Sequence, residues 1–284
     1  MAMNRELPFI KGHGTGNDFV ILPDVEGRLD LTEPQVQWLC DRHVGIGANG
    51  ILRVVRTEHV PEFAEWASLA EYFMDYRNAD GSIAEMCGNG ARVFARYLHA
   101  SGLVTDPEVV IGTRGGLRST VLNPDGSITI DMGVASSPDS MAGAVVDVGD
   151  RQWEATAVVA PNPHAVLFVD DLDQAGDLLS APPITPPSAF PEGANVEFVH
   201  VVGPRHVEMR VHERGVGETL SCGTGACAVA WAARRQVEPE VTGETTYRVD
   251  VPGGTLAVTE TESGVLLMTG PAELVARGTV LLPR

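Results

Sequence analysis

The alternation of hydrophobic and polar positions predicts a chain of many short strands and few helices. Apolar runs typical of strands occur at residues 8–11, 18–22, 51–55, 72–76 and 195–199, and again from residue 245 onwards. A glycine-rich turn at residues 12–17 joins the first two runs. Residues 32–42 are expected to be helical, because Thr32 can cap the first turn and Pro34 lies where a helix tolerates proline. Residues 57–70 show no clear period and predict an irregular excursion.

The two halves of the chain repeat the same order of elements. Each half runs through strands to a loop and then to a helix-like stretch, at residues 92–98 and at residues 227–233. We expect the boundary near residue 131, which gives domains at residues 1–131 and 132–269. A proline cluster in the second half predicts a surface loop, and it comprises Pro182, Pro183, Pro186, Pro187 and Pro191. Strand-rich halves with one long helix each predict an α+β pair of similar domains, with the active site in a cleft between them.

A short sequence recurs just ahead of each helix-like stretch. Residues 87–91 (CGNGA) match residues 222–226 (CGTGA), so that Cys87 and Cys222 occupy equivalent positions. A cysteine before a helix start lies where unpaired backbone N–H groups and the helix dipole favour thiolate. The glycines would let an anionic group of a ligand approach the same N–H groups.

Two such units facing each other would place a sulfur on either side of one small carboxylate ligand. This geometry would allow a proton to leave one face of a carbon and return to the other. A single C-G-x-G sequence is more typical of packing, because cysteine is among the residues most often buried. The repeat gives the chemical interpretation about the same weight as duplication of an inert half-domain, so the surrounding residues decide between them.

Composition narrows the class of protein. The chain has 284 residues, 44% of them hydrophobic, with 31 glycines and 19 prolines, which is typical of a globular, turn-rich protein. A net charge of −18 argues against nucleic acid or an anionic membrane as a partner. We find neither an apolar run long enough for a membrane helix nor a signal-peptide core. Four cysteines without C-x-x-C spacing argue against a zinc site or a disulfide scaffold and indicate reduced thiols in the cytoplasm.

Lysine usage bears on the cofactor. Lys11 is the only lysine in the sequence, and a pyridoxal-phosphate enzyme needs a lysine for its Schiff base. We therefore expect an amino-acid racemase built from this chain to work without that cofactor. The histidines show no metal-ligand spacing, and no metal is expected.

A set of polar residues in predicted turns accompanies the two thiols. The set comprises Asn17, Asn78, Asn162, Asn195, Glu213 and Arg214. Asparagine in a turn usually serves the turn itself. As a set, however, these side chains could bind a zwitterion, because Arg214 can grip a carboxylate and Glu213 an ammonium group. His164 could hold the ionisation state of one thiol, or it could be structural.

Six motifs, in order along nearly the whole chain, resemble the diaminopimelate epimerase family. They are residues 11–19 (KGHGTGNDF), 78–82 (NADGS), 87–92 (CGNGAR), 162–164 (NPH), 213–215 (ERG) and 222–226 (CGTGA). The resemblance implies a two-base enzyme without pyridoxal phosphate that interconverts LL- and meso-diaminopimelate, on the route to lysine and the cross-linked cell wall. It implies two similar domains, each a strand-rich mixed sheet around a central helix, with residues from about 270 to 284 returning to the first domain. It also suggests a homodimer.

The resemblance assigns roles residue by residue. Cys87 and Cys222 correspond to the acid/base pair, and His164 and Glu213 to the pair that tunes the thiols. The reacting end of the substrate is assigned to Gly88, Asn89, Gly223, Thr224 and Asn17. The distal carboxylate is assigned to Asn78, Asn162, Asn195 and Arg214, and the distal ammonium to Glu213.

Two departures from the family pattern affect this assignment. Gly50 stands where many members carry glutamine, so one contact to the substrate amino group is absent or comes from another group. Pro161 replaces the usual glycine before residues 162–164, which stiffens that turn.

Two alternatives remain open from the sequence. A different cofactor-independent racemase, for proline, hydroxyproline or histidine, would use the same scaffold. The predicted distal set argues for a substrate with a second zwitterionic end, which proline lacks. A thiol switch or an amino-acid binding module is the alternative outside catalysis, but a binding module would not need two thiols at one carboxylate.

Overall fold

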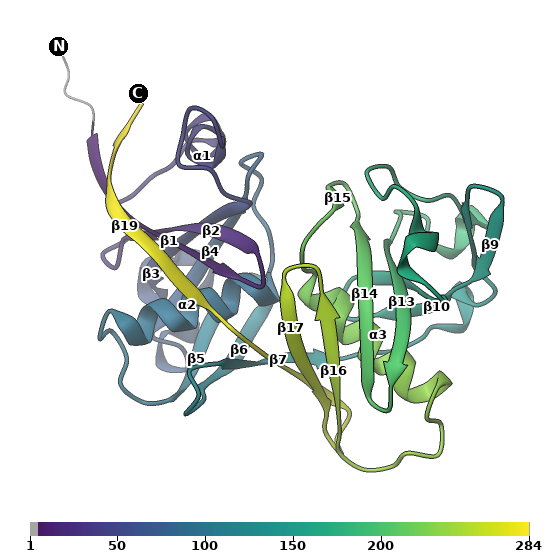
Figure 1. Cartoon of the computed structure of the whole chain (residues 1–284). Helices are drawn as coiled ribbons and strands as arrows, with labels where there is room; N and C mark the ends of the chain where they lie inside the picture. Colours follow the sequence, from purple (N-terminus) through teal and green to yellow (C-terminus); the bar gives the residue numbers. More distant parts are fainter. Residues whose placement is uncertain (1–4, 284) are drawn as a thin grey trace. The chain divides into compact units, whose positions relative to one another are not determined.

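The structure, a computed structural model, describes residues 5–283. Its contacts divide the chain into two compact units. The first unit runs to Ile130 and is completed by the segment that begins at Pro271, and the second unit comprises Asp131–Gly270. Each unit contains a mixed sheet that wraps around one long helix, which confirms the α+β class predicted from the sequence pattern (Figure 1).

The sheet of the first unit follows the order β7-β6-β5-β4-β3-β2-β1-β19. Its strands are β1 (Arg5–Gly14), β2 (Asn17–Pro23), β3 (Gly50–Arg56), β4 (Tyr72–Asn78), β5 (Glu108–Thr113), β6 (Gly116–Leu122), β7 (Ile128–Val134, which reaches into the second unit) and β19 (Glu273–Leu282). Strand β19 lies antiparallel beside β1, so that the two are neighbours at one edge (Figure 1). The pairs β2–β3 and β4–β5 are parallel, which makes the sheet mixed.

The helices of the first unit are α1 (Glu33–Cys40) and α2 (Gly88–Ala100). Helix α1 begins with a capping box between Thr32 and Gln35, and it ends two residues earlier than the sequence predicts. The chain turns away there because the carboxylate of Asp41 accepts hydrogen bonds from two later backbone N–H groups. Helix α2 packs against β1, β2, β3, β4, β6 and β19, and its side chains from Val93 to Ala95 are fully buried. The predicted excursion at residues 57–70 contains two 3₁₀ helices, Thr57–His59 and Pro61–Ser68.

The main sheet of the second unit follows the order β10-β11-β13-β14-β16-β17-β18, with β15 beside β14. Its strands are β10 (Thr156–Val159), β11 (Pro163–Phe168), β13 (Asn195–Gly203), β14 (His206–Glu213), β15 (Gly217–Glu218), β16 (Thr245–Val251), β17 (Gly254–Glu260) and β18 (Val265–Gly270). Helix α3 (Gly223–Gln236) packs against this sheet, and its buried residues are mostly alanines and glycines. Small side chains let the strands approach a helix that is buried on most sides.

A second, smaller sheet covers part of this unit. It is formed by β8 (Val145–Val148), β9 (Arg151–Glu154) and β12 (Ile184–Thr185), in the order β12-β8-β9. The proline cluster, predicted as a surface loop, includes β12 and the 3₁₀ turn Pro187–Ala189. Phe190 and Ile184 pack into the core, so the segment is also part of the hydrophobic core.

Candidate active site

Cys87 forms the N-cap of α2. Its backbone is extended, and its Sγ accepts a hydrogen bond from the N–H of Gly90 at 3.4 Å. The helix starts at Gly88, directly after the thiol and ahead of the apolar stretch that predicted it. Gly88 and Asn89 are buried in the first turn, and the Cys87 side chain is half-buried. The thiol therefore lies at the positive end of the helix dipole, as the sequence predicts.

A chain of amide side chains leads away from Cys87. Asn17 directs its Nδ2 towards Sγ of Cys87 at 3.9 Å, and its Oδ1 accepts a hydrogen bond from Asn49 at 3.0 Å. Asn49 in turn accepts one from Arg42 at 2.7 Å, and Arg42 pairs with Asp18. Asn49 is a residue for which the sequence predicted no role. It enters the site because the parallel pairing of β2 with β3 brings the two asparagines together.

Asn17 owes its position to a tight hairpin. The predicted turn at residues 12–17 is shorter than expected, because β1 extends to Gly14 and β2 begins at Asn17. Thr15 and Gly16 form the connection, both with positive φ, at 49° and 79°. The fully buried Arg92 of α2 donates a hydrogen bond to the Thr15 hydroxyl, which stabilises the turn.

Two further positions of the first unit, Asn78 and Gly50, were singled out from the sequence. Asn78 ends β4, and its side chain donates to the hydroxyl of Ser82 in its own turn rather than to the network around Cys87. Gly50 has no room for the side chain that many family members carry. A Cβ there would approach the carbonyl oxygen of Arg77 to 2.6 Å, and the ring of Tyr76 to 2.7 Å.

Cys222 forms the N-cap of α3 in the second unit. Its Sγ accepts a hydrogen bond from the N–H of Gly225 at 3.3 Å and lies 3.4 Å from the hydroxyl of Thr224. The helix starts at Gly223, so the cap repeats the one at Cys87. Unlike Cys87, however, Cys222 is buried, with 5% of its surface exposed.

The register of the sheet gathers the polar residues of the second unit. Strands β11 and β13 run parallel with His164 opposite Asn195. The ring of His164 is fully buried, and its Nε2 lies 3.0 Å from Oδ1 of Asn162. Oδ1 of Asn195 accepts a hydrogen bond from the backbone N–H of Arg214 at 2.8 Å, which fixes the start of the turn after β14. Asn195 therefore begins a strand, whereas Asn162 and Arg214 lie in turns next to strand ends, as the sequence predicts.

Glu213 ends β14, and Arg214 begins the turn that follows, with different surroundings. Glu213 accepts a hydrogen bond from the Thr219 hydroxyl at 2.5 Å. Burial raises the pKa of the Glu213 carboxyl above its usual value, while the Thr219 hydroxyl lowers it. Arg214 is exposed, and its guanidinium donates to the backbone carbonyl of Glu192 at 3.1 Å.

Glu197 is a residue of this region that sequence reasoning missed. It is fully buried on β13, and its Oε1 lies 2.6 Å from Nδ1 of His164. An acidic residue inside the apolar run of residues 196–199 was the signal that could have identified it, because buried carboxylates need partners.

The electrostatics of Cys222 correct one expectation. Burial raises the pKa of the Cys222 thiol well above its usual value, and the carboxylates of Glu213 and Glu197 raise it further. The Thr224 hydroxyl and the Gly225 N–H lower the pKa, but less than burial raises it. The prediction that a helix start favours thiolate is therefore wrong for Cys222 in this structure, because desolvation exceeds the effect of the helix terminus.

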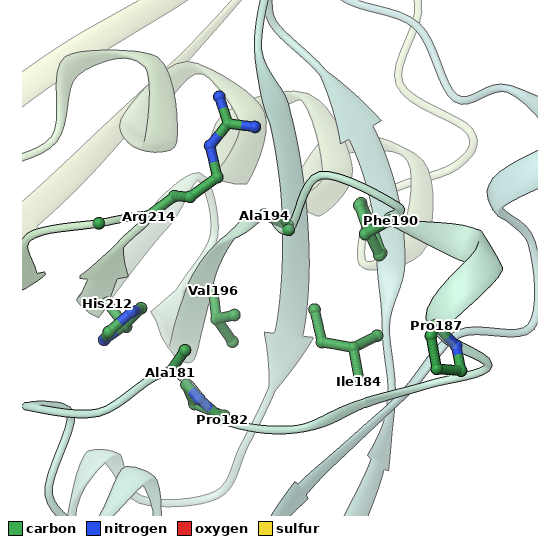
Figure 2. Close-up of a pocket in the computed structure, with 11 residues that line it drawn as sticks. Ala181, Pro182, Ile184, Pro187, Phe190, Ala194, Val196, His212 and Arg214 are labelled. Atoms are coloured by element: carbon green, nitrogen blue, oxygen red, sulfur yellow. The ribbon is translucent and has the colours of Figure 1, made fainter.

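Figure 2 shows a pocket of about 220 Å³ in the second unit, lined mainly by apolar side chains. Its walls come from the proline-rich segment and from the ends of β13 and β14. Arg214 contributes to the rim, but its guanidinium points away from Ala181 and Pro182 (Figure 2). Cys222 is not among the lining residues. We therefore interpret this pocket as a packing gap beneath the proline-rich segment rather than as the reaction site.

The two other cysteines and the single lysine lie in buried or ion-paired surroundings. Burial raises the pKa of the Cys40 thiol to about 11, and Cys227 is fully buried in α3. Lys11 forms an ion pair with Asp18 at 2.6 Å. Among residues 5–283, we find no cluster of three or more histidine, cysteine or acidic side chains that could hold a metal ion. Over the same residues, no helix is both long and apolar enough to cross a membrane.

Comparison with solved structures identifies the fold. A phenazine biosynthesis protein of the PhzF family from Bacillus anthracis superposes with a TM-score of 0.71 at 20% identity, covering 98% of this chain and 99% of that one. A hydroxyproline epimerase from Agrobacterium vitis gives a TM-score of 0.67 at 16% identity, covering 99% and 92%. At this level of identity, the likeness shows that the fold is shared.

Sequence relatives are much closer. A family model described as diaminopimelate epimerase matches residues 9–137 and 156–275. The diaminopimelate epimerase of Streptomyces coelicolor is 56% identical over 280 residues, covering 97% of this chain and 96% of that protein. The diaminopimelate epimerase of Thermobifida fusca is 49% identical over 279 residues, covering 96% and 98%. The chain therefore belongs to the diaminopimelate epimerase family.

Proposed function

We propose that this protein is an epimerase that interconverts LL- and meso-2,6-diaminopimelate without pyridoxal phosphate, in the supply of lysine and peptidoglycan precursors. The observation that carries the proposal is the pair of cysteine caps. In each unit a thiol lies at the start of the central helix, where backbone N–H groups are available to a carboxylate. Membership of the family supports diaminopimelate as the substrate.

In the proposed reaction, the thiolate of one cysteine removes the α-proton, and the thiol of the other donates a proton to the opposite face. The electrons of the broken C–H bond move onto the α-carboxylate, which gains enolate-like charge. Backbone N–H groups at residues 88–89 and 223–224 would stabilise that charge. After one turnover the two cysteines have exchanged protonation states. The enzyme in this second protonation state catalyses the reverse reaction.

We propose that the polar residues beyond the thiols bind the distal end of the substrate. We assign the distal carboxylate to Arg214 with the amides of Asn78, Asn162 and Asn195, and the distal ammonium to Glu213. Because the Glu213 carboxylate raises the pKa of Cys222, an ammonium group beside Glu213 would reduce that effect. Substrate binding would thereby make the second thiol easier to ionise.

The proposed chemistry also has consequences for location and assembly. Two-base catalysis needs one free thiol and one thiolate, so we propose that the enzyme works in the reducing cytoplasm. All four cysteines are free thiols in the structure. A homodimer is part of the same proposal by family resemblance.

Isotope exchange tests the function directly. Purified protein is incubated in D₂O with LL- or meso-diaminopimelate and no added cofactor, and both the isomer ratio and α-deuterium are measured. We expect each isomer to yield the other, with deuterium from the solvent at the inverted carbon. Exchange with proline or hydroxyproline but not with diaminopimelate would favour the alternative racemase, and no exchange with any of them would contradict catalysis.

A further inference from the structure

A carboxylate that the proposed proton transfer does not use is fully buried near the second thiol. Glu197 is the third residue of β13, and its side chain has no exposed surface. Its Oε1 lies 2.6 Å from Nδ1 of His164. A Cβ at Gly225 would lie 2.8 Å from the same oxygen, so the carboxylate is in close contact with the first turn of α3.

The charge of Glu197 needs a partner at this depth. Its Oε2 has no hydrogen-bond partner among the residues that the structure describes. Glu213, at the end of β14, places a second acidic group near His164, and His212 and the Cys222 thiol are further titratable groups nearby. An unbalanced buried carboxylate is strongly unfavourable, and a positive charge on the adjacent ring of His164 would balance it.

The other ring nitrogen of His164 supports the same protonation state. Nε2 lies 3.0 Å from Oδ1 of Asn162, and an amide oxygen can only accept a hydrogen bond. Nε2 therefore donates to Asn162, and with an ionised Glu197 the Nδ1–H donates to the carboxylate, so that the ring is an imidazolium. With its oxygen engaged by the ring, Asn162 has its NH₂ group left to donate.

We propose that Glu197 is a positioning residue that acts through His164 on Asn162. Its carboxylate holds the imidazolium, the imidazolium holds the amide oxygen, and the NH₂ group of Asn162 is thereby presented to a carboxylate of the substrate. The opposite amide orientation would present an oxygen, which cannot bond to a carboxylate. Only the identity of that substrate carboxylate rests on the proposed function.

Nitrogen NMR of the histidine rings tests the first step without substrate. In protein labelled with ¹⁵N-histidine, at neutral pH, both ring nitrogens of His164 should carry protons. Glu197→Gln should leave only one of them protonated. A His164→Gln variant assigns the signal among the eight histidines. A singly protonated ring in the unchanged protein would overturn the proposal, and that result depends neither on a variant folding nor on the substrate.

Steady-state kinetics test the second step. Glu197→Gln should raise KM for diaminopimelate about tenfold to a hundredfold, the range expected for a lost hydrogen bond to a charged group, and should lower kcat less. Glu260→Gln is the matched control, because Glu260 is a buried carboxylate of the same unit that pairs with Arg234 and Arg235. The control should leave KM and the His164 signal unchanged.

The outcomes separate this proposal from the proposed function. An unchanged KM in a folded Glu197→Gln protein would overturn the link from Glu197 to Asn162. If the unchanged protein shows the doubly protonated His164 but does not act on diaminopimelate, the proposed function fails and the positioning of Asn162 stands. If Glu197→Gln and Glu260→Gln shift KM equally, the role of Glu197 is general stability and the proposal is wrong.

Discussion

The two cysteine-capped helices have the same local geometry. In each, the thiol precedes two residues and then a glycine whose N–H donates to the sulfur, at 3.4 Å from Gly90 and 3.3 Å from Gly225. Their surroundings differ. Cys87 is half-buried, whereas Cys222 is almost completely removed from solvent.

The charged and polar groups near the two thiols also differ. The first thiol contacts the neutral amide of Asn17, and the chain of amides behind it ends at the cation Arg42. The second thiol lies within the influence of two carboxylates, Glu213 and Glu197, which raise its pKa. A duplicated backbone motif therefore does not duplicate the electrostatics. A two-base reaction must begin with one thiol and one thiolate, and this difference favours Cys222 as the thiol that keeps its proton.

The largest expected effect comes from removing either thiol. Cys87→Ala and Cys222→Ala should each reduce epimerisation at least about a thousandfold, because each removes one partner in proton transfer. Cys40→Ala is the control, since that thiol is buried with a pKa of about 11 and should leave activity close to normal. Turnover is measured together with α-deuterium exchange. Near-normal inversion in either catalytic variant would contradict the two-base assignment.

Arg214→Leu should have the next largest effect. Losing a hydrogen bond between the guanidinium and a substrate carboxylate costs about 1.5–3 kcal/mol, which should appear as a higher KM and a lower kcat. Arg210→Leu, on β14 four residues before Arg214, removes an arginine that pairs with Glu218 instead. We expect that control to lower the melting temperature with little change in KM. If Arg214→Leu turns over diaminopimelate like the parent, the distal carboxylate is bound elsewhere.

Alanine at the third helix position should separate the two caps. In Gly225→Ala, the new Cβ would lie 2.8 Å from Oε1 of Glu197, so we expect a loss of about 1–3 kcal/mol in stability. In Gly90→Ala, the nearest atoms are side-chain carbons at 3.3–3.4 Å, and the helical preference of alanine, about 1 kcal/mol, offsets the crowding. Calorimetry on both variants measures the difference. Equal melting temperatures would show that the two caps are equally tolerant.

The smallest expected effect is a difference between the alkylation rates of Cys87 and Cys222. Without substrate, iodoacetamide should label Cys87 before Cys222, because the second thiol is buried and its pKa is raised. Below its pKa a thiolate fraction rises about tenfold per pH unit, so labelling of Cys222 should still increase from pH 8 to pH 9. Glu213→Gln should speed labelling of Cys222 a few-fold and leave Cys87 as an internal reference. Peptide mass spectrometry follows both sites, and faster labelling of Cys222 in the parent would reverse the assignment.

Local sequence was sufficient to predict the two caps but not their surroundings. Cysteine followed by glycines and an apolar helix marks a helix start, which the structure confirms at Cys87 and Cys222. The contact of Asn49 with Asn17 depends on the pairing of β2 with β3, which no short motif reveals. The raised pKa of Cys222 likewise depends on burial, and burial is a property of the fold rather than of the motif.

The pairing of β19 with β1 has a consequence for synthesis of the chain. Strand β1 finds β2 within a few residues, but its partner on the other edge, Glu273–Leu282, is translated only after the whole second unit. The sheet of the first unit is thus incomplete through most of translation, with the backbone groups on one side of β1 exposed to other chains. The second unit, which is continuous in sequence, has no such delay. Nascent chains stalled before residue 273 should therefore be the aggregation-prone species.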